Sequence, residues 1–168
     1  PVPKKQERIP KAEPIVGIVF CILFAFVFLA VPQVIGVYFE QGQWMPIFNV
    51  PKIQAAWPII VVFTVLGVLR ESVKLYEGRY TKRLAAVSAA TNLLSAGLSC
   101  AFLLGSSILN PQFLLYIQGL FSGDAAFLST AFGQINLIFL AVILFALCLD
   151  TVVTAYKAFK YDSREQRK

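Results

Sequence analysis

The chain has 168 residues, of which 58% are hydrophobic and only 14% are charged, and its mean hydropathy is +0.71. An ordinary soluble domain is about 45–50% apolar and about 25% charged, so this composition indicates a membrane protein and excludes an ordinary soluble domain. The net charge of +6 does not indicate nucleic-acid binding, because the basic residues flank apolar runs instead of forming one basic face.

The residue types present also limit the chemistry. Histidine is absent, which excludes histidine-based acid–base catalysis, Ser-His-Asp and Cys-His nucleophiles, and histidine metal sites. Cys21, Cys100 and Cys148 each lie in an apolar run and form no Cys-x-x-Cys pair, so we expect them to be buried as small apolar residues. No phosphate-binding loop, metal-ligand spacing or cofactor motif is present. We therefore expect no catalytic activity, no cofactor and no metal.

The first apolar run covers Ile15–Phe39 and follows a polar tail, residues 1–14, that four prolines interrupt. A helix over this run would be about 38 Å long at about 1.5 Å per residue, which exceeds the hydrocarbon core of about 30 Å. We therefore expect a tilted span with a kink at Pro32, near its outer end. The chain starts at Pro1 and its only methionine is Met45, so we expect a processed chain or a part of a longer protein.

The second apolar run, Ala56–Leu69, follows a loop at residues 40–55 and ends at Arg70. Trp44 and Trp57 flank this run, and aromatic residues of this kind favour the headgroup level of a membrane. We expect both tryptophans to be interface anchors. The alternative is that they form a platform for a ligand.

The segment Arg70–Arg83 holds five basic residues among fourteen, and we expect it to lie outside the hydrocarbon. Two apolar runs precede it and two follow it, so it divides the chain into two membrane hairpins. Fourteen of the fifteen basic residues lie in this segment and in the tails at residues 1–14 and 157–168, and only Lys52 lies elsewhere. By the positive-inside rule, we expect both tails and this segment to be cytoplasmic and their basic rim to attract anionic lipid.

The third apolar run, Leu84–Leu109, is rich in small residues. Gly97, Ala101 and Gly105 repeat every four residues and therefore share one helix face. Small residues at this spacing let transmembrane helices approach closely, so we expect the other helices to pack against this one. We also expect Asn92 to hydrogen-bond to a neighbouring helix. The alternative is that the small-residue face forms the seam of a homodimer.

The segment Asn110–Asp124 interrupts the apolar pattern with Pro111, Gly119 and Gly123. The apolar and aromatic stretch within it is too short to span a membrane. We expect a short helix that lies in the outer interface, with a re-entrant segment as the alternative. The fourth apolar run is Ala125–Leu149.

Asp150 follows the fourth run and precedes Lys157 by seven residues, or about 10 Å of helix. A carboxylate at the centre of a span costs about 2.5–3.5 kcal/mol on insertion scales, which favours a partner in the protein. Arg70 and Arg83 lie at the same cytoplasmic level and are the candidates for an ion pair that joins the two hairpins. The alternative is a solvated acid at the inner rim.

Several strings of the sequence resemble a known family. They are Pro32–Phe39, Pro46–Asn49, Lys74–Ala85, Asn92–Ser95 and Ala155–Tyr161. They resemble the membrane region of Gram-positive bacterial proteins with a helix-turn-helix-associated anti-sigma (HAAS) or permease-prefix-type signalling domain. In that family a small soluble helical domain precedes the spans and a PadR-like regulator is often a genomic neighbour. The resemblance implies no catalytic residues.

Together these patterns predict an all-α membrane protein with four transmembrane helices in two hairpins and a short interfacial helix in the second outer loop. We expect a multi-pass protein of the bacterial cytoplasmic membrane with both termini in the cytoplasm. Its expected partners are the lipid bilayer, including anionic lipid, and a protein partner or a second copy of the chain, but not nucleic acid. The functional hypothesis is a sensor or regulatory membrane anchor, and the alternative is an accessory membrane subunit of a transporter or export complex.

Overall fold

The computed structural model describes residues 8–38, 42–120 and 130–165, with only the backbone described at residues 162–165. The described chain is all-α apart from one small two-stranded sheet. Four long helices form its body and are listed here in chain order: α1 (Ala12–Ala30), α3 (Trp57–Glu77), α4 (Lys82–Leu103) and α7 (Ile135–Glu165).

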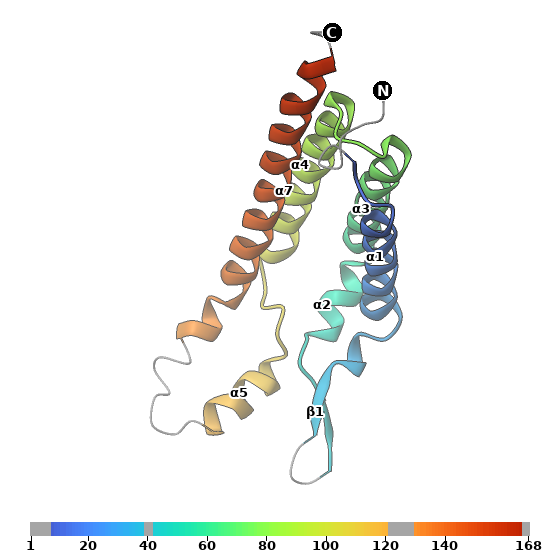
Figure 1. Cartoon of the computed structure of the whole chain (residues 1–168). Coiled ribbons are helices and arrows are strands. Elements are labelled where there is room, and N and C mark those ends of the chain that lie inside the picture. The colour runs from blue at the N-terminus through green and yellow to red at the C-terminus, as the bar shows by residue number, and fades with distance from the viewer. Residues whose placement is uncertain (1–7, 39–41, 121–129, 166–168) are drawn as a thin grey trace.

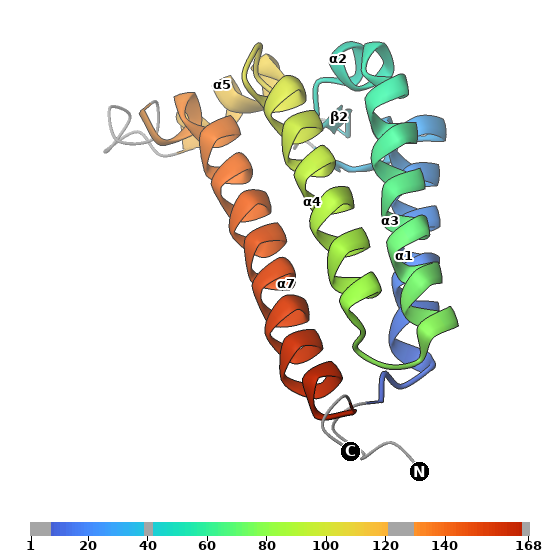
Figure 2. The same ribbon diagram turned by 90° about the horizontal axis from the view of Figure 1, so that it is seen from above.

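The long helices pack in a row rather than in a closed bundle. α1 packs on α3, α3 on α4, and α4 on α7, and among the described residues α1 and α7 share no contact of comparable extent. Figure 2 shows α7, α4 and α3 side by side in this order, with α1 against α3. The start of α1, the end of α7 and the α3–α4 turn lie at one end of the row, which we call the termini end (Figure 1). We call the opposite end the loop end.

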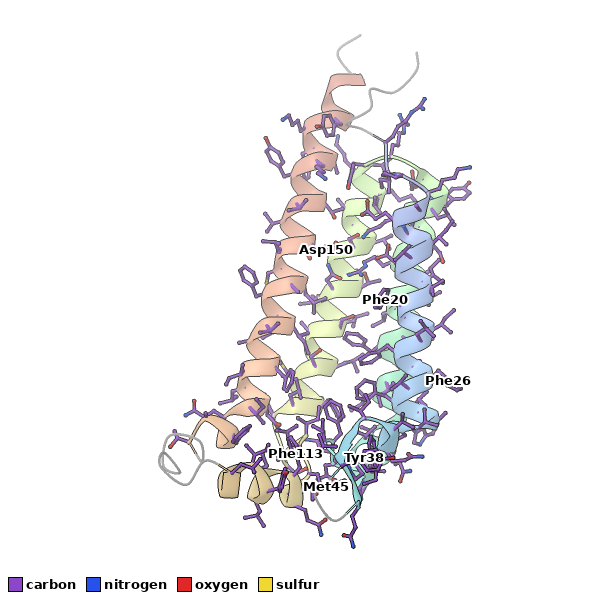
Figure 3. The ribbon with its side chains drawn as sticks, turned by 60° about the horizontal axis from the view of Figure 1, so that its bottom comes forward. Phe20, Phe26, Tyr38, Met45, Phe113 and Asp150 are labelled. Atoms are coloured by element: carbon purple, nitrogen blue, oxygen red, sulfur yellow. The ribbon has the colours of Figure 1, made fainter. Side chains whose placement is uncertain are left out.

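Three helices are long and apolar enough to cross a membrane: α1, α4, and the part of α7 from Ile135 to Tyr161. Many of their large apolar side chains are exposed. Phe20 and Phe26 on α1, both labelled in Figure 3, are 69% and 60% exposed. Exposed apolar area on this scale is unusual for a soluble monomer and fits contact with hydrocarbon.

The helix α3 is not among these three, because the eight residues from Arg70 to Glu77 include four charges. The prediction that the segment Arg70–Arg83 forms a loop is wrong for residues 70–77, which continue the helix α3. No proline or glycine interrupts the chain until Gly78, so the helix continues through the charges. Gly78 then ends it in the left-handed conformation with φ 63°, where glycine carries no Cβ penalty.

The first apolar run also differs from its prediction. The helix α1 ends at Ala30, and Pro32 opens a short 3-10 turn, η1 (Pro32–Val34), instead of kinking a longer helix. Proline lacks an N–H and disfavours helical backbone in the residue before it, so the helix stops there. The chain continues as strand β1 (Gly36–Tyr38), which pairs antiparallel with β2 (Trp44–Pro46). Phe39, the predicted end of the span, lies outside the described residues.

Both tails are shorter than predicted. Helix α1 begins at Ala12, and the buried Ile9 donates its N–H to the Gly78 carbonyl at 2.9 Å, which ties the chain before α1 to the α3–α4 turn. Helix α7 continues to Glu165, eight residues past the predicted start of the tail at Lys157. Thr154 and Ala158 are buried, so packing extends along this helix beyond the apolar run. The predicted start of the fourth span at residues 125–129 lies outside the described residues.

The loop end holds the sheet and two short helices, α2 (Val50–Ala55) and α5 (Pro111–Leu120). The helix α5 confirms the short helix predicted in the second outer loop. Helix α4 ends at Leu103, and the chain after it turns toward the loop that precedes α2. Asn49 N donates to Ile108 O at 2.8 Å and Asn110 N donates to Ile47 O at 2.9 Å, so backbone hydrogen bonds join the two loops.

Asn136 on α7 fixes the same region from the other side. Its Oδ1 accepts the Ile108 N–H at 2.9 Å, and its Nδ2 donates to the carbonyls of Leu103 at 3.0 Å and Ser106 at 2.9 Å. The side chain therefore satisfies backbone groups that the end of α4 leaves without helical partners. A small apolar cluster lies here, formed by Leu103, Ile108, Leu109 and Leu140.

Candidate functional site

Charged side chains from two helices meet between the helix pairs α1–α3 and α4–α7. Arg70, Glu71 and Lys74 lie on α3 at spacings of one, three and four residues, which places Arg70 and Lys74 on one face with Glu71 beside them. Asp150 lies at the middle of α7 (Figure 3 labels it). The side chains of Glu71 and Lys74 are only 7% and 8% exposed.

These four groups, which we call the charge cluster, form a connected set of ion pairs. Glu71 Oε1 lies 2.9 Å from Arg70 Nη2 and 3.2 Å from Lys74 Nζ. Asp150 forms ion pairs with both cations, with Oδ2 3.4 Å from Arg70 Nη1 and Oδ1 3.6 Å from Lys74 Nζ. Two positive and two negative charges balance, and each has an opposite partner. Mutual neutralisation is the condition under which buried charges are tolerated.

Asn92 joins the charge cluster from the middle of α4. Its Oδ1 accepts from Arg70 Nη1 at 2.8 Å, and its Nδ2 donates to Asp150 Oδ2 and to Thr151 Oγ1, each at 2.9 Å. The amide can both donate and accept, so one side chain bridges a guanidinium and a carboxylate. As expected from the sequence, Asn92 hydrogen-bonds to neighbouring helices, here to α3 and α7.

The helix α1 reaches the charge cluster through Gly17. A Cβ built at Gly17 would lie 2.9 Å from both Cγ and Cδ of Glu71, so the Glu71 side chain lies directly on the α1 backbone. One turn further along, a Cβ at Gly67 of α3 would lie 2.8 Å from Cys21 Sγ. Small residues thus allow the close approach of α1 and α3, the type of contact common between transmembrane helices.

The structure brings together Asp150 and Arg70 but not Asp150 and Arg83. Arg83 lies 3.8 Å from Glu77 instead, and its side chain is 74% exposed. The reason is axial position, because Asp150 lies level with Asn92, nine residues or about 14 Å further along α4 than Arg83. Sequence reasoning missed Glu71 and Lys74. Their helical spacing from Arg70, with no helix-breaking residue between them, was the signal that could have found them.

The predicted packing face of α4 is not the buried one. Gly97 and Ala101 are exposed, a Cβ at Gly97 or Gly105 would meet no atom within 4 Å, and Gly105 lies beyond the end of the helix. The buried face is polar and small, and its members are Ser88, Asn92, Ser95 and Ser99. Both faces allow close approach, but the buried one carries Asn92, whose amide bonds to α3 and α7. Ser99 Oγ donates within α4 to Ser95 O at 2.8 Å, and Ser88 Oγ has no hydrogen-bond partner among the described residues.

The two predicted interface anchors lie at the loop end. Trp44 Nε1 donates to the Gln33 carbonyl at 2.7 Å, and its ring packs edge-on against Tyr38 at 4.7 Å between centroids. Trp57 begins α3 and is 59% exposed. Trp44 is 42% exposed, so both rings reach the surface.

Comparisons with protein-family models, with curated proteins and with solved structures give no match to this chain. In the part of the chain that the structure describes, no group of three or more cysteine, aspartate or glutamate side chains could hold a metal ion. The charge cluster is therefore the strongest candidate site. It can hold two helix pairs together, and it can release them when one of its charges is removed.

Proposed function

We propose that this chain is a four-span protein of the bacterial cytoplasmic membrane and that α3 is its fourth span. The 21 residues of α3 would cover about 32 Å at about 1.5 Å per residue, enough to cross the hydrocarbon core. Its charges do not forbid this, because Arg70, Glu71 and Lys74 are neutralised within the protein rather than exposed to lipid. The pairs α1–α3 and α4–α7 then correspond to the two expected hairpins.

The proposed orientation places the termini end in the cytoplasm. The basic residues near this end include Arg8, Lys11, Lys82, Arg83 and Lys160, whereas Lys52 is the single basic residue of the two loop-end segments, residues 31–56 and 104–134. This asymmetry is the positive-inside pattern. The basic rim would face the anionic lipid of the inner leaflet.

We infer that the protein works as a sensor or regulatory anchor without catalytic activity. The charge cluster carries this inference, because it is a polar link between the two helix pairs and lies toward the termini end. Ionisable groups within membrane spans are costly and mark functional sites by default. A change in the cluster would alter how the pairs pack and would be passed along α1 and α7 to the cytoplasmic ends. The resemblance to HAAS-type and permease-prefix-type signalling proteins supports the same role.

The second candidate is an accessory membrane subunit of a transporter or export complex. The exposed small-residue face at Gly97 and Ala101 favours it, since another transmembrane helix could approach closely there. The helix α5, which has no buried residue, offers a further docking surface at the loop end.

Affinity purification of the tagged protein from native membranes separates the two candidates. A cytoplasmic regulator that co-purifies with the wild-type chain, and is lost or enriched with Asp150→Asn, supports the sensor. Co-purification of an ATPase or permease subunit that Asp150→Asn leaves unchanged, but Gly97→Leu removes, supports the accessory subunit. The two variants are matched controls for each other, because each alters one of the two surfaces.

A further inference from the structure

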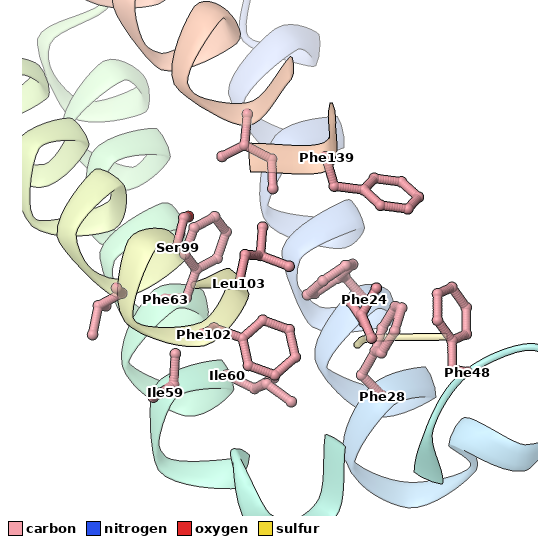
Figure 4. Close-up of a pocket in the computed structure, with 13 residues that line it drawn as sticks. Phe24, Phe28, Phe48, Ile59, Ile60, Phe63, Ser99, Phe102, Leu103 and Phe139 are labelled. Carbon is pink, nitrogen blue, oxygen red and sulfur yellow. The ribbon is translucent and has the colours of Figure 1, made fainter. Parts of the chain in front are cut away.

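An apolar groove of about 190 Å³ lies between the two helix pairs toward the loop end (Figure 4). All four long helices contribute to its walls, together with the loop before α2. Its lining is dominated by aromatic rings from these elements, namely Phe24, Phe28, Phe48, Phe63, Phe102 and Phe139. The one polar side chain in the wall, Ser99, already donates its hydroxyl to Ser95 O. The groove thus offers contacts to hydrocarbon and no unsatisfied polar group.

The groove exists because the helices form an open row. Its walls include Phe24 on α1 and Ile143 on α7, two helices that share no extensive contact among the described residues. Empty protein cavities of this size lined by apolar side chains stay dry and accept small apolar groups. A space of this volume can take a segment of one acyl chain but not a whole lipid.

A cation lies next to one of the residues that line the groove. Lys52 Nζ lies 5.2 Å from the centre of the ring of Phe102, which lines the groove, and it donates to the Ser106 carbonyl. None of the described carboxylates pairs with Lys52. Burial lowers the pKa of this ammonium, and a nearby anion would favour its charged form again.

We propose that the groove binds one acyl chain of an anionic phospholipid whose phosphate lies at Lys52. The apolar walls fit the chain, and the cation beside Phe102 selects the charge of the headgroup. A zwitterionic lipid would keep the chain contacts but would bring its own cation toward Lys52. The proposal depends on the proposed orientation in one respect only, namely which leaflet of the membrane supplies the lipid.

The test uses the purified full chain in detergent after removal of native lipid. Native mass spectrometry measures the binding of dioctanoyl phosphatidylglycerol and dioctanoyl phosphatidylcholine. We expect the wild-type protein to prefer phosphatidylglycerol. Lys52→Gln should weaken phosphatidylglycerol binding about tenfold, the scale of one charge-assisted hydrogen bond, and leave phosphatidylcholine binding unchanged. Gln54→Ala, at an exposed position two residues further along the same short helix, is the matched control and should bind both lipids like the wild type.

A second pair of variants tests the groove itself. Ile143→Trp fills it from α7 and should weaken the binding of both lipids, whereas Val142→Trp places the same ring at a neighbouring position that is 60% exposed and should have no effect. Leu98→Trp fills the groove from α4 and gives an independent reading if Ile143→Trp does not fold.

Three results would overturn the proposal. One is a phosphatidylglycerol preference that survives Lys52→Gln, and another is lipid binding that both groove-filling variants leave intact. The third is a spectrum in which a second copy of the chain, rather than lipid, is lost on filling the groove. Because binding is measured in detergent, a failure here is separate from a failure of the membrane orientation or of the regulatory role.

Discussion

The two ends of the helix row join the same two helix pairs by different chemistry. At the loop end, backbone groups of one loop bond to backbone groups of the other, and the amide of Asn136 completes the set. Nearer the termini end, the link consists of side chains with full charges, with Asn92 as the bridge. Amides and backbone groups keep their charge state, whereas carboxylates and amines can change theirs. The contacts at the loop end are therefore permanent, whereas those in the charge cluster can change with its charges.

The first prediction tests whether the loop end and the termini end lie on opposite sides of a membrane. Gly42 and Gly78 are matched positions, since both have positive φ and open space for a Cβ. In a background without the three native cysteines, an impermeant thiol reagent applied to intact cells should label Gly42→Cys and miss Gly78→Cys. Both should react after lysis. The reverse pattern in intact cells would show that the orientation is the opposite one. Equal labelling would show that the two ends do not lie on opposite sides of a membrane.

The largest energetic effect should come from the most buried charge. Glu71→Gln leaves Arg70 and Lys74 with one carboxylate between them, and removing one partner of a buried ion pair costs about 3–5 kcal/mol. Denaturation in mixed detergent micelles measures this loss. Glu77→Gln is the control, because its partner Arg83 is 74% exposed and an exposed pair contributes about 0–1 kcal/mol. Equal losses in the two variants would mean that the cluster is solvated.

At the loop end, Asn136→Ala should destabilise the protein by about 1–3 kcal/mol, because the Ile108 N–H and two carbonyls lose their partner. Gln134→Ala, an exposed amide two residues earlier that makes only backbone hydrogen bonds to the described residues, is the control. If the contrast between the ends is right, Asn136→Ala lowers stability without changing what co-purifies with the termini. A changed partner set in Asn136→Ala would show that the loop end also takes part in regulation.

The ion pair predicted from the sequence should show a measurable coupling. In a double-mutant cycle, Arg70→Gln and Asp150→Asn should be non-additive by about 1 kcal/mol, within the range for groups in contact. The coupling is smaller than the Glu71 effect because these side chains are 21% and 28% exposed. The pair Arg83→Gln and Asp150→Asn should be additive. Additivity in both cycles would make Asp150 the solvated rim residue of the alternative interpretation.

What the sequence could predict depended on whether a signal was local. Three apolar runs formed helices long and apolar enough to cross a membrane, because length and hydropathy are properties of the run itself. Asp150 indicated a partner because an isolated carboxylate at that position is costly. Glu71 and Lys74 were missed because charge was treated as a boundary, although only Gly78 carries the signal that ends a helix. Which face of α4 is buried depends on the helices that pack against it. Because serine and glycine are both small, residue size alone could not distinguish the serine face from the glycine face.

The smallest predicted change in stability concerns the glycine face of α4. Gly97→Ala should change stability little or raise it slightly, because the added methyl meets open space and alanine favours a helix by up to about 1 kcal/mol. Gly17→Ala is the matched substitution on α1. It should cost about 1 kcal/mol, the low end for an overpacked contact, since Glu71 is held by Arg70 and Lys74 and cannot move aside freely.

Both glycine variants are compared by thermal stability in detergent, at protein concentrations low enough to keep the chain monomeric. Equal losses would mean that the exposed small-residue face has a partner that one chain alone does not contain. In that case the loss at Gly97→Ala should grow with protein concentration, because a second copy stabilises by mass action, and the loss at Gly17→Ala should not. The glycine face would then be the homodimer seam, and the serine face would remain the packing surface within the chain.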